Sequence, residues 1–443
     1  MLSSNMPTHS LFLLSLGCSK NTVDSERLLA QAAAAAIRSV ERVDEADTIL
    51  INTCAFIEDA KKESIEEMLA ALDKKREGVV KQVFVMGCLP ELYRRELQEE
   101  LPEVDAFFGT RELPQILASL GARYRSELFD ERLLLTPSHY AYLKISEGCN
   151  RICSFCSIPK IRGRYQSQPL EQLLREATRL QQQGVQELNL IAQDISLFGY
   201  DTTGHSQLNE LLLRLSDMDF LWIRLLYAYP VNFPLEVIDT MRDRSNICNY
   251  LDIPLQHCND RILRAMKRGV TKADTIRLLH EMRQRNPNIR LRTTMLVGFP
   301  GETRAEFEEL LDFVEEQRFD RLGCFPYNHE EHAPSAMLED LLSIEEKEER
   351  VSELMELQEA VAESLNREFE GKEIEVVVDS FVEEMAFCRS EYDAPEVDNE
   401  CLLTFGAQNI QAGNFYRALI NDSSAHELYG EIVQERSAGN SPQ

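Results

Sequence analysis

Three cysteines, Cys149, Cys153 and Cys156, lie within eight residues in the spacing C-x3-C-x2-C. A short apolar strand expected at 142–145 and a turn at Gly148 lead into this loop. A loop of this kind can bend three thiolates onto one small object. A tetrahedral zinc site normally takes four protein ligands, whereas a four-iron cluster held by three thiolates keeps one iron open. The spacing therefore favours an iron–sulfur cluster that also binds a small molecule.

Two other interpretations of this triplet stay open at the level of the residues. The cysteines could be half of a zinc site that His139 or a distant cysteine completes, or they could be ordinary buried thiols. A disulfide is disfavoured, because the chain has eleven cysteines and no secretory signal, which indicates a reducing compartment.

Three more cysteines each stand at the end of an expected buried strand: Cys18 after 11–16, Cys54 after 48–52, and Cys88 after 83–86. Helical patterns separate these strands, so we expect a parallel sheet. The carboxyl ends of parallel strands share one edge, where ligands bind. One such cysteine would usually be a small buried apolar residue. Three of them predict a second metal site, most simply another 4Fe–4S cluster.

The composition sets limits on the kind of protein. A chain of 443 residues with 44% hydrophobic residues predicts two or three domains. No apolar run approaches the roughly 20 residues of a membrane span. Residues 1–10 are polar without Lys or Arg, so we expect no signal or transit peptide and a cytoplasmic protein. The net charge of −28 argues against a protein whose main function is to bind nucleic acid, and it suits binding to a basic protein partner.

From residue 140 to residue 325, strand and helix patterns alternate in six units. Six units predict an open partial (βα)6 barrel with its chemistry at the carboxyl ends of the strands. Several strand ends carry polar or turn residues that could touch a ligand or could simply form turns and caps: Gln193, Asp194, Tyr227, Tyr229, Pro230, Pro254, Gln256, Gly298, Gly301 and Glu302. We do not expect His257 to be a ligand. Four basic residues surround the cysteine loop and could meet an anion or be solvated: Arg151, Lys160, Arg162 and Arg164.

The C-terminal part begins with a charged amphipathic helix expected at 339–370. Five short strands follow between 373 and 433, which predicts a small antiparallel barrel of OB-like size. Residues 369–435 hold 15 acidic and 3 basic residues. A barrel that binds RNA normally shows the opposite charge, so we expect this one to bind a basic protein surface.

With both cysteine sets, the core and the barrel in view, the chain resembles the methylthiotransferase family of radical S-adenosylmethionine (radical SAM) enzymes. The motifs that carry the resemblance are SLGCSKNTVDSE at 15–26, SEGCNRICSFC at 146–156 and VGFPGE at 297–302. It covers residues 11 to 435 and implies three domains: an N-terminal cluster domain at 9–122, a radical SAM core with a connector helix at 135–368, and a TRAM domain at 369–436. The GCSKN segment, RLLYAYP at 224–230 and the acidic barrel resemble the ribosomal branch of the family. Members of that branch methylthiolate the β-carbon of an aspartate in the small-subunit ribosomal protein S-twelve.

The resemblance also implies the cofactors and the site residues. Cys149, Cys153 and Cys156 would hold the 4Fe–4S cluster that binds SAM and cleaves it to a 5′-deoxyadenosyl radical, which can open an unactivated C–H bond. Cys18, Cys54 and Cys88 would hold a second 4Fe–4S cluster that presents the sulfur. For SAM contacts we expect Phe155, Ile158 and Gln193, the last because AQD at 192–194 stands near the place of the Gly-Gly-Glu segment of many radical SAM proteins. No catalytic residue is expected beyond the cluster ligands.

The implied partners are ribosomal protein S-twelve, free or within the assembling ribosome, an electron donor and a sulfur source. We expect no membrane and no nucleic acid as direct substrate. One alternative is a tRNA isopentenyladenosine methylthiotransferase, which basic charge on the barrel would favour. The other is a non-catalytic iron–sulfur protein that binds the ribosome, which reductive cleavage of SAM would exclude.

Overall fold

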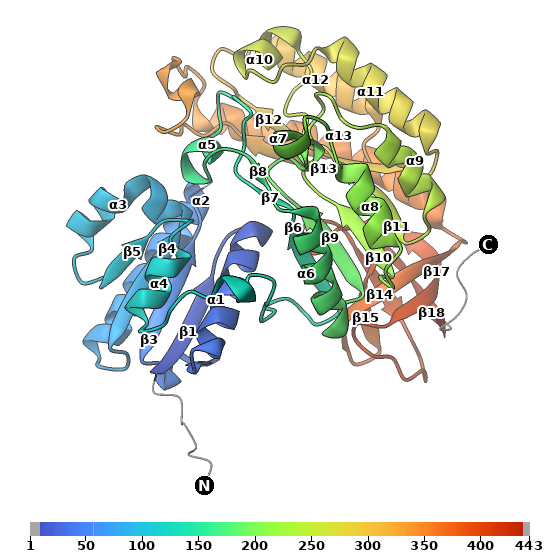
Figure 1. Cartoon of the computed structure of the whole chain (residues 1–443). Coiled ribbons are helices and arrows are strands. Elements are labelled where there is room, and N and C mark those ends of the chain that lie inside the picture. The colour runs from blue at the N-terminus through green and yellow to red at the C-terminus, as the bar shows by residue number, and fades with distance from the viewer. Residues whose placement is uncertain (1–8, 56, 437–443) are drawn as a thin grey trace. The chain divides into compact units, whose positions relative to one another are not determined.

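The computed structural model describes residues 9–55 and 57–436 (Figure 1). Residues 1–8 lie outside this range. They make up most of the segment 1–10, for which we expect no signal or transit peptide. The chain forms two compact units. One contains the residues up to 135 with 142–151 and 156–179, and the other contains 136–141, 152–155 and the residues from 180 onward. In the part of the chain that is described, no helix is long and apolar enough to cross a membrane.

The first unit is built on a five-stranded sheet in the order β2-β1-β3-β4-β5, and all four pairings are parallel. Its strands are β1 (His9–Ser15), β2 (Ile37–Ser39), β3 (Thr48–Thr53), β4 (Gln82–Gly87) and β5 (Ala106–Phe108). Strand β3 is buried along its whole length, as expected for a strand covered on both faces.

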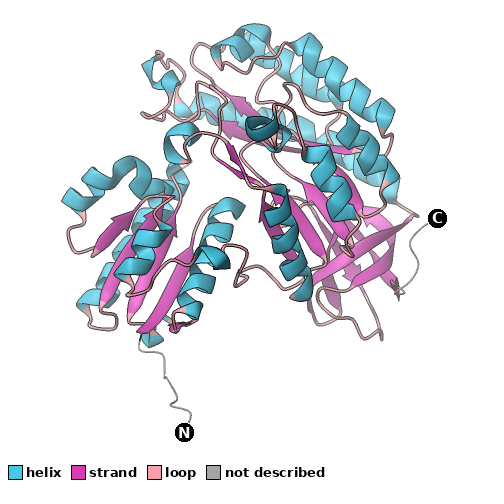
Figure 2. Cartoon of the chain, viewed as in Figure 1, coloured by secondary structure: helices cyan, strands magenta, loops and turns pink. Residues whose placement is uncertain are grey.

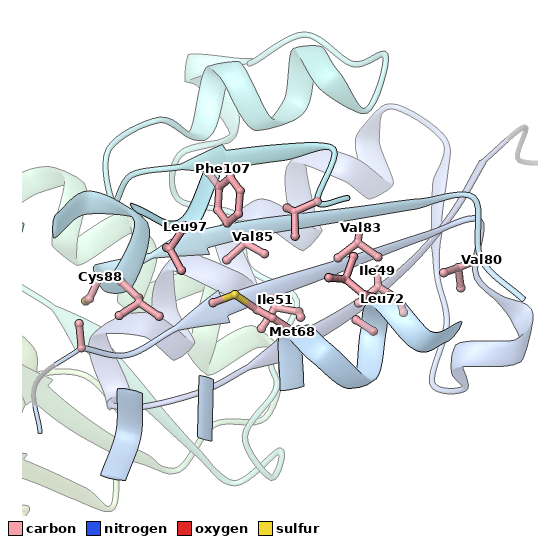
Figure 3. Packing of buried hydrophobic residues seen from close by; sticks show 14 of the residues in the cluster. Ile49, Ile51, Met68, Leu72, Val80, Val83, Val85, Cys88, Leu97 and Phe107 are labelled. Atoms are coloured by element: carbon pink, nitrogen blue, oxygen red, sulfur yellow. The ribbon is translucent and has the colours of Figure 1, made fainter. Parts of the chain in front are cut away.

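Helices cover both faces of this sheet: α1 (Ser19–Ala34), α2 (Glu58–Arg76), α3 (Cys88–Glu100) and α4 (Leu113–Ser119). On one face, Met68 and Leu72 of α2 pack against Ile49 and Ile51 of β3, and Cys88 lies at one end of this cluster (Figure 3). On the other face, α1 and α4 pack against Leu50 and its neighbours. The sheet is therefore held between two apolar layers, which fixes the edge at which its strands end.

A six-stranded sheet has the order β13-β12-β11-β10-β9-β6, and its pairings from β9 to β13, which lie in the second unit, are parallel. Its strands are β6 (Tyr140–Lys144), β9 (Glu187–Ile191), β10 (Trp222–Leu225), β11 (Ile247–Asp252), β12 (Arg290–Val297) and β13 (Arg321–Pro326). The helices between them are α6 (Leu170–Gln182), α7 (Tyr200–Thr203), α8 (Leu208–Ser216), α9 (Glu236–Asp243), α10 (Asp260–Ala265), α11 (Lys272–Arg285) and α12 (Arg304–Gln317). Figure 2 shows this alternation of strand and helix.

A long helix, α13 (Ile344–Asn366), leads into a closed barrel in the order β14-β15-β16-β18-β17. The barrel strands are β14 (Glu373–Val382), β15 (Met385–Ser390), β16 (Glu400–Thr404), β17 (Phe415–Ser423) and β18 (Glu427–Glu435). The predicted fold class is confirmed in all three parts: a parallel α/β sheet, an open six-stranded βα sheet and a small β-barrel. The three-domain division itself stays a prediction.

The barrel is joined to the sheet of its unit by buried ion pairs near the amino ends of the strands. Arg224 of β10 binds Glu187 of β9 at 3.0 Å, and Arg389 of the barrel binds the other oxygen of Glu187 at 2.7 Å. Further along the sheet, Arg321 pairs with barrel Asp393 at 2.7 Å. Three more barrel carboxylates bind residues outside the barrel: Asp379 with His139, Glu391 with Asn249, and Asp398 with Arg292. Part of the barrel's acidity therefore holds the unit together and does not face a partner.

Some elements differ from the prediction. Helix α1 begins at Ser19, directly after Cys18, and the buried polar residues Lys20 and Asn21 belong to its first turn. The short edge strand β2 and the position of β15 were not predicted. Strand β2 contains polar residues at exposed positions, and β15 buries the polar residues Arg389 and Ser390, so neither strand gives a plain apolar signal.

Candidate iron–sulfur sites

The three N-terminal cysteines lie at the carboxyl edge of the first sheet, where adjacent strands end. Cys18 precedes the first residue of α1, Cys54 directly follows β3, and Cys88 is the first residue of α3. Cys88 is close enough to Cys18 and Cys54 for their charges to interact with it. Two of the three thiols stand at helix N-termini, whose unpaired N–H groups favour a thiolate.

At this edge of the sheet, the backbone at Gly17 lies very close to Cys54. Gly17 has a φ of +88°, and a Cβ placed on it would lie 2.8 Å from Cys54 Cβ and 3.1 Å from Cys54 Sγ. No L side chain fits there without moving that thiol. The edge thus brings three sulfurs together and leaves the space beside Cys54 free of another side chain, which fits a cluster held by three thiolates.

Asn21 links the segments that carry these cysteines. Its side-chain amide donates hydrogen bonds to the carbonyl oxygens of Leu16 at 2.9 Å and Thr53 at 3.0 Å. Its side-chain oxygen accepts a short hydrogen bond from Arg162. The same arginine nitrogen lies 3.8 Å from Cys88 Sγ. Asn21 is the last residue of the GCSKN motif, and its hydrogen bonds hold the cysteine-bearing segments together.

Arg162 is buried, so it is not the solvated charge that was one reading of the sequence. It pairs with Asp24, which also binds Lys144. Burial alone would raise the pKa of Asp24, but Lys144 and Arg162 lower it to about 2. Burial raises the pKa of the Cys88 thiol to about 12, and the Arg162 charge opposes this rise. Arg162 therefore favours the thiolate, which is the form that binds iron.

The C-x3-C-x2-C loop begins on a small antiparallel ribbon formed by β7 (Ser146–Glu147) and β8 (Gln166–Ser167). The N–H of Cys149 donates to the carbonyl of Gly163 at 3.1 Å. Gly148, with a φ of +76°, lies so close to the returning chain that a Cβ on it would be 2.3 Å from the Arg164 carbonyl oxygen. The ribbon and this close approach fix where the first cysteine of the loop emerges.

Cys153, the middle cysteine of the loop, is buried and has a buried arginine beside it. Arg268 Nη1 donates to Cys153 Sγ at 3.3 Å, and the guanidinium stacks over the Tyr229 ring at 4.2 Å. The Tyr229 hydroxyl donates to the Arg268 carbonyl at 2.8 Å and lies 3.6 Å from the same sulfur. Sequence reasoning missed Arg268, because a basic residue after a helix resembles any solvated one.

We expect Arg268→Gln to lower the midpoint potential of the cluster held by this loop. A hydrogen bond from a positive donor stabilises the more negative, reduced cluster, and its loss corresponds to a shift on the order of 50 mV. The measurement is a redox titration followed by electron paramagnetic resonance, in protein whose Cys18, Cys54 and Cys88 are alanine so that one cluster is present. Arg264→Gln, an exposed arginine of α10, is the matched control. Equal potentials in the two variants would contradict this role for Arg268.

Within residues 9–55 and 57–436, no three His, Cys, Asp or Glu side chains converge closely enough to hold a single metal ion. The thiolates of a four-iron cluster bind different irons and therefore stay farther apart than the ligands of one ion. His139, the residue that could have completed a zinc site, binds Asp379 at 2.7 Å. The donor chemistry of both cysteine sets fits 4Fe–4S clusters, while their role as ligands stays a prediction.

The expected SAM contacts are placed as follows. Phe155 packs partly buried against Phe299 and Tyr327, in the same unit as Cys153. Ile158 packs against the core of the first unit. Gln193 is half-buried just beyond the carboxyl end of β9. These residues are therefore not brought together within one unit, and their contact with SAM stays a prediction.

Other strand-end residues serve the fold or carry backbone strain. Asp194 accepts from the Ser196 N–H at 2.9 Å and caps a short helix. Buried Glu302 binds Arg350 at 2.6 Å. By contrast, Tyr227 and Gln256 adopt φ values of 66° and 77° at the carboxyl ends of β10 and β11. Bulky residues in this conformation cost about 1–3 kcal/mol each and cluster at functional sites, so this strain marks the edge where chemistry is expected.

Three family models match successive parts of the chain. Uncharacterized protein family UPF0004 matches residues 10–109, the radical SAM superfamily matches 143–314, and the TRAM domain matches 371–433. The chain is thus a radical SAM enzyme that carries a C-terminal TRAM barrel.

Similar proteins identify the family of this chain within the radical SAM enzymes. The ribosomal protein uS12 methylthiotransferase RimO of Pelodictyon phaeoclathratiforme is 69% identical over 428 residues, which are 97% of this chain and 99% of that protein. The protein of the same name from Chlorobaculum tepidum is 66% identical over 423 residues, 96% of this chain and 98% of that protein. The chain belongs to the family of ribosomal protein uS12 methylthiotransferases. The predicted cofactors, SAM and two 4Fe–4S clusters, are confirmed at the level of this family.

Solved structures agree on the fold alone. The radical S-adenosylmethionine methyltransferase TsrM from Kitasatospora setae, solved with tryptophan substrate and a SAM analog, gives a TM-score of 0.57 at 14% identity, over 74% of this chain and 75% of that one. The same enzyme with cobalamin and a 4Fe-4S cluster bound gives a TM-score of 0.55, over 74% and 77% of the two chains.

Proposed function

We propose that this chain transfers a methylthio group to the β-carbon of an aspartate in ribosomal protein uS12. The observation that carries the proposal is the identity of 62–69% over almost the whole chain to relatives named for this activity. Both cysteine sets support it. We assign Cys149, Cys153 and Cys156 to the SAM-binding cluster and Cys18, Cys54 and Cys88 to the second cluster.

The bound clusters supply a radical that can open an unactivated C–H bond and a sulfur that the substrate carbon can accept. The chain's own residues hold and tune these groups. Arg268 donates to Cys153, and Arg162 lies beside Cys88, so each cysteine set has one buried positive charge next to a sulfur. We assign Phe155, Ile158 and Gln193 to SAM binding. An electron donor and a sulfur source complete the reaction, which we place in the cytoplasm with the ribosome.

The tRNA alternative needs a surface for the phosphate backbone. The barrel instead has a large excess of acidic residues, and its Arg389 is buried in ion pairs with Glu187 and Asp379. The non-catalytic alternative gives no reason for two sets of three cysteines, each with a buried arginine. Both points support a protein substrate and a catalytic role.

The test is mass analysis of uS12 and of bulk tRNA from cells with and without this gene. We expect the methylthio mass on uS12 to disappear in cells that lack the gene, while tRNA stays unchanged. Purified enzyme with SAM and a reductant should also form 5′-deoxyadenosine. Loss of the modification from tRNA alone would overturn the choice of substrate, and absence of SAM cleavage would overturn the enzymatic role.

A further inference from the structure

The three most exposed large apolar side chains lie in two segments of the chain. Among the described residues, the three highest exposures of large apolar side chains are 90% for Met337, 76% for Leu341 and 71% for Ile152. Leu338 and Ile344, close to the first two in sequence, are also exposed. Side chains of this size are costly to leave in water, and a group of them rimmed by charge marks a site of protein interaction.

A hydrogen bond ties the two segments that carry these side chains together. The N–H of Ser335 donates to the carbonyl of Ser154 at 2.7 Å, and Ser154 lies between Cys153 and Cys156 in the cysteine loop. Met337 is two residues after Ser335, and Ile152 is two residues before Ser154. The Tyr327 hydroxyl also donates to Ser335 Oγ at 3.0 Å, which holds this segment in place. The exposed apolar group therefore borders the loop expected to hold the SAM cluster.

The charge beside Met337 and Leu341 is negative. Six carboxylates lie between 339 and 349: Glu339, Asp340, Glu345, Glu346, Glu348 and Glu349. The basic residues next to them point inward. Lys347 is buried against Asp340 at 2.5 Å, and Arg350 is buried against Glu302 and Glu346. Such a surface repels the phosphates of a nucleic acid or of an anionic membrane and attracts a positively charged protein.

We propose that Met337, Leu341 and Ile152, with the acidic rim beside them, form the docking surface for the substrate ribosomal protein. The inference rests on the proposed function. A protein that packs against ribosomal RNA needs basic residues to meet its phosphates, and these complement the acidic rim. The surface also lies where the substrate must arrive, since the reacting carbon has to reach the cysteine loop. The barrel is a weaker candidate, because four of its carboxylates bind residues of its own unit.

The test uses full-length enzyme with both clusters reconstituted and recombinant uS12. Met337→Ser with Leu341→Ser should raise KM for uS12 on the order of 100-fold, since an apolar side chain central to an interface contributes about tenfold or more. SAM cleavage without uS12 should stay at the wild-type rate, because neither side chain is assigned to SAM or to a cluster. Val382→Ser with Val433→Ser, two exposed valines of the barrel, is the matched control and should change nothing.

A second measurement locates the contact directly. Met337 replaced by p-benzoylphenylalanine should crosslink to uS12 on illumination, and Val382 replaced in the same way should not. A KM that rises only in the barrel variant, with a crosslink only from position 382, would overturn the proposal. A crosslink between two copies of the enzyme, with KM unchanged, would assign the surface to self-association. If wild-type enzyme cleaves SAM but leaves uS12 unmodified, the proposed function fails and the docking proposal fails with it.

Discussion

Replacing Cys18, Cys54 and Cys88 together with alanine is expected to abolish methylthiolation of uS12, while the purified protein still cleaves SAM reductively. The reason is that the two cysteine sets are assigned different tasks, SAM cleavage for the C-x3-C-x2-C loop and sulfur presentation for the other set. The three substituted thiols stand at the edge of a different sheet from that loop. Anaerobically reconstituted protein should fall from about eight irons per chain to about four. The measurements are iron analysis, 5′-deoxyadenosine formation and the mass of uS12.

Two sets of controls sharpen this prediction. Alanine at Cys149, Cys153 and Cys156 should remove both SAM cleavage and methylthiolation. Alanine at Cys388, a buried thiol in the core of the barrel, should change neither the iron content nor the activities. If the first triple variant lost SAM cleavage as well, or kept about eight irons, the assignment of a second cluster to that edge would be wrong.

Glu187→Gln is expected to lower the free energy of unfolding of the second unit by about 3–5 kcal/mol. Glu187 is fully buried between Arg224 and Arg389. Burial opposes its ionisation, yet the charges of Arg389 and Arg224 hold its pKa below the usual range. A neutral amide would leave buried Arg224 without its counter-charge and would leave buried Arg389 with Asp379 alone. Urea-induced unfolding measures the loss, and faster proteolysis near residue 370 would show the barrel loosening.

The exposed ion pair between Arg304 and Glu353, at 2.6 Å, provides the comparison. Glu353→Gln should cost less than about 1 kcal/mol, because solvent screens a surface pair. Replacing Glu187 with leucine, and Arg224 and Arg389 with methionine, should recover much of the stability, since well-packed apolar groups can substitute for a buried ion network. Equal losses from Glu187→Gln and Glu353→Gln would mean that the buried network contributes little.

The sequence allowed the architecture and the edge positions of the cysteines to be predicted, because these follow from local patterns. Apolar runs such as 48–52 mark buried strands, and a cysteine at the end of each parallel strand must lie at their common edge. The companions of the cysteines could not be predicted in this way. Arg162 and Arg268 meet their sulfurs only through folding, since Arg162 is 74 residues from Cys88 and Arg268 is 115 residues from Cys153.

The sequence could not show which acidic residues of the barrel have partners inside the chain, also for a physical reason. A count of acidic residues does not tell which of them face inward. Asp393 and Asp398 look like surface residues in the sequence, but they are the partners of Arg321 and Arg292. In the same way, the sequence could not show that Met337 faces solvent, because its neighbours Leu338 and Leu341 resemble the start of an apolar helix face.

The pairing of barrel carboxylates with strand arginines affects the use of shortened chains. A fragment that ends near residue 370 would keep Arg292 and Arg321 but lose their barrel partners Asp398 and Asp393. The uncovered sheet would then expose Arg321 without a carboxylate partner and Arg292 with Asp252 alone, and such guanidinium groups bind phosphates. Any affinity of such a fragment for RNA would be an artefact of truncation.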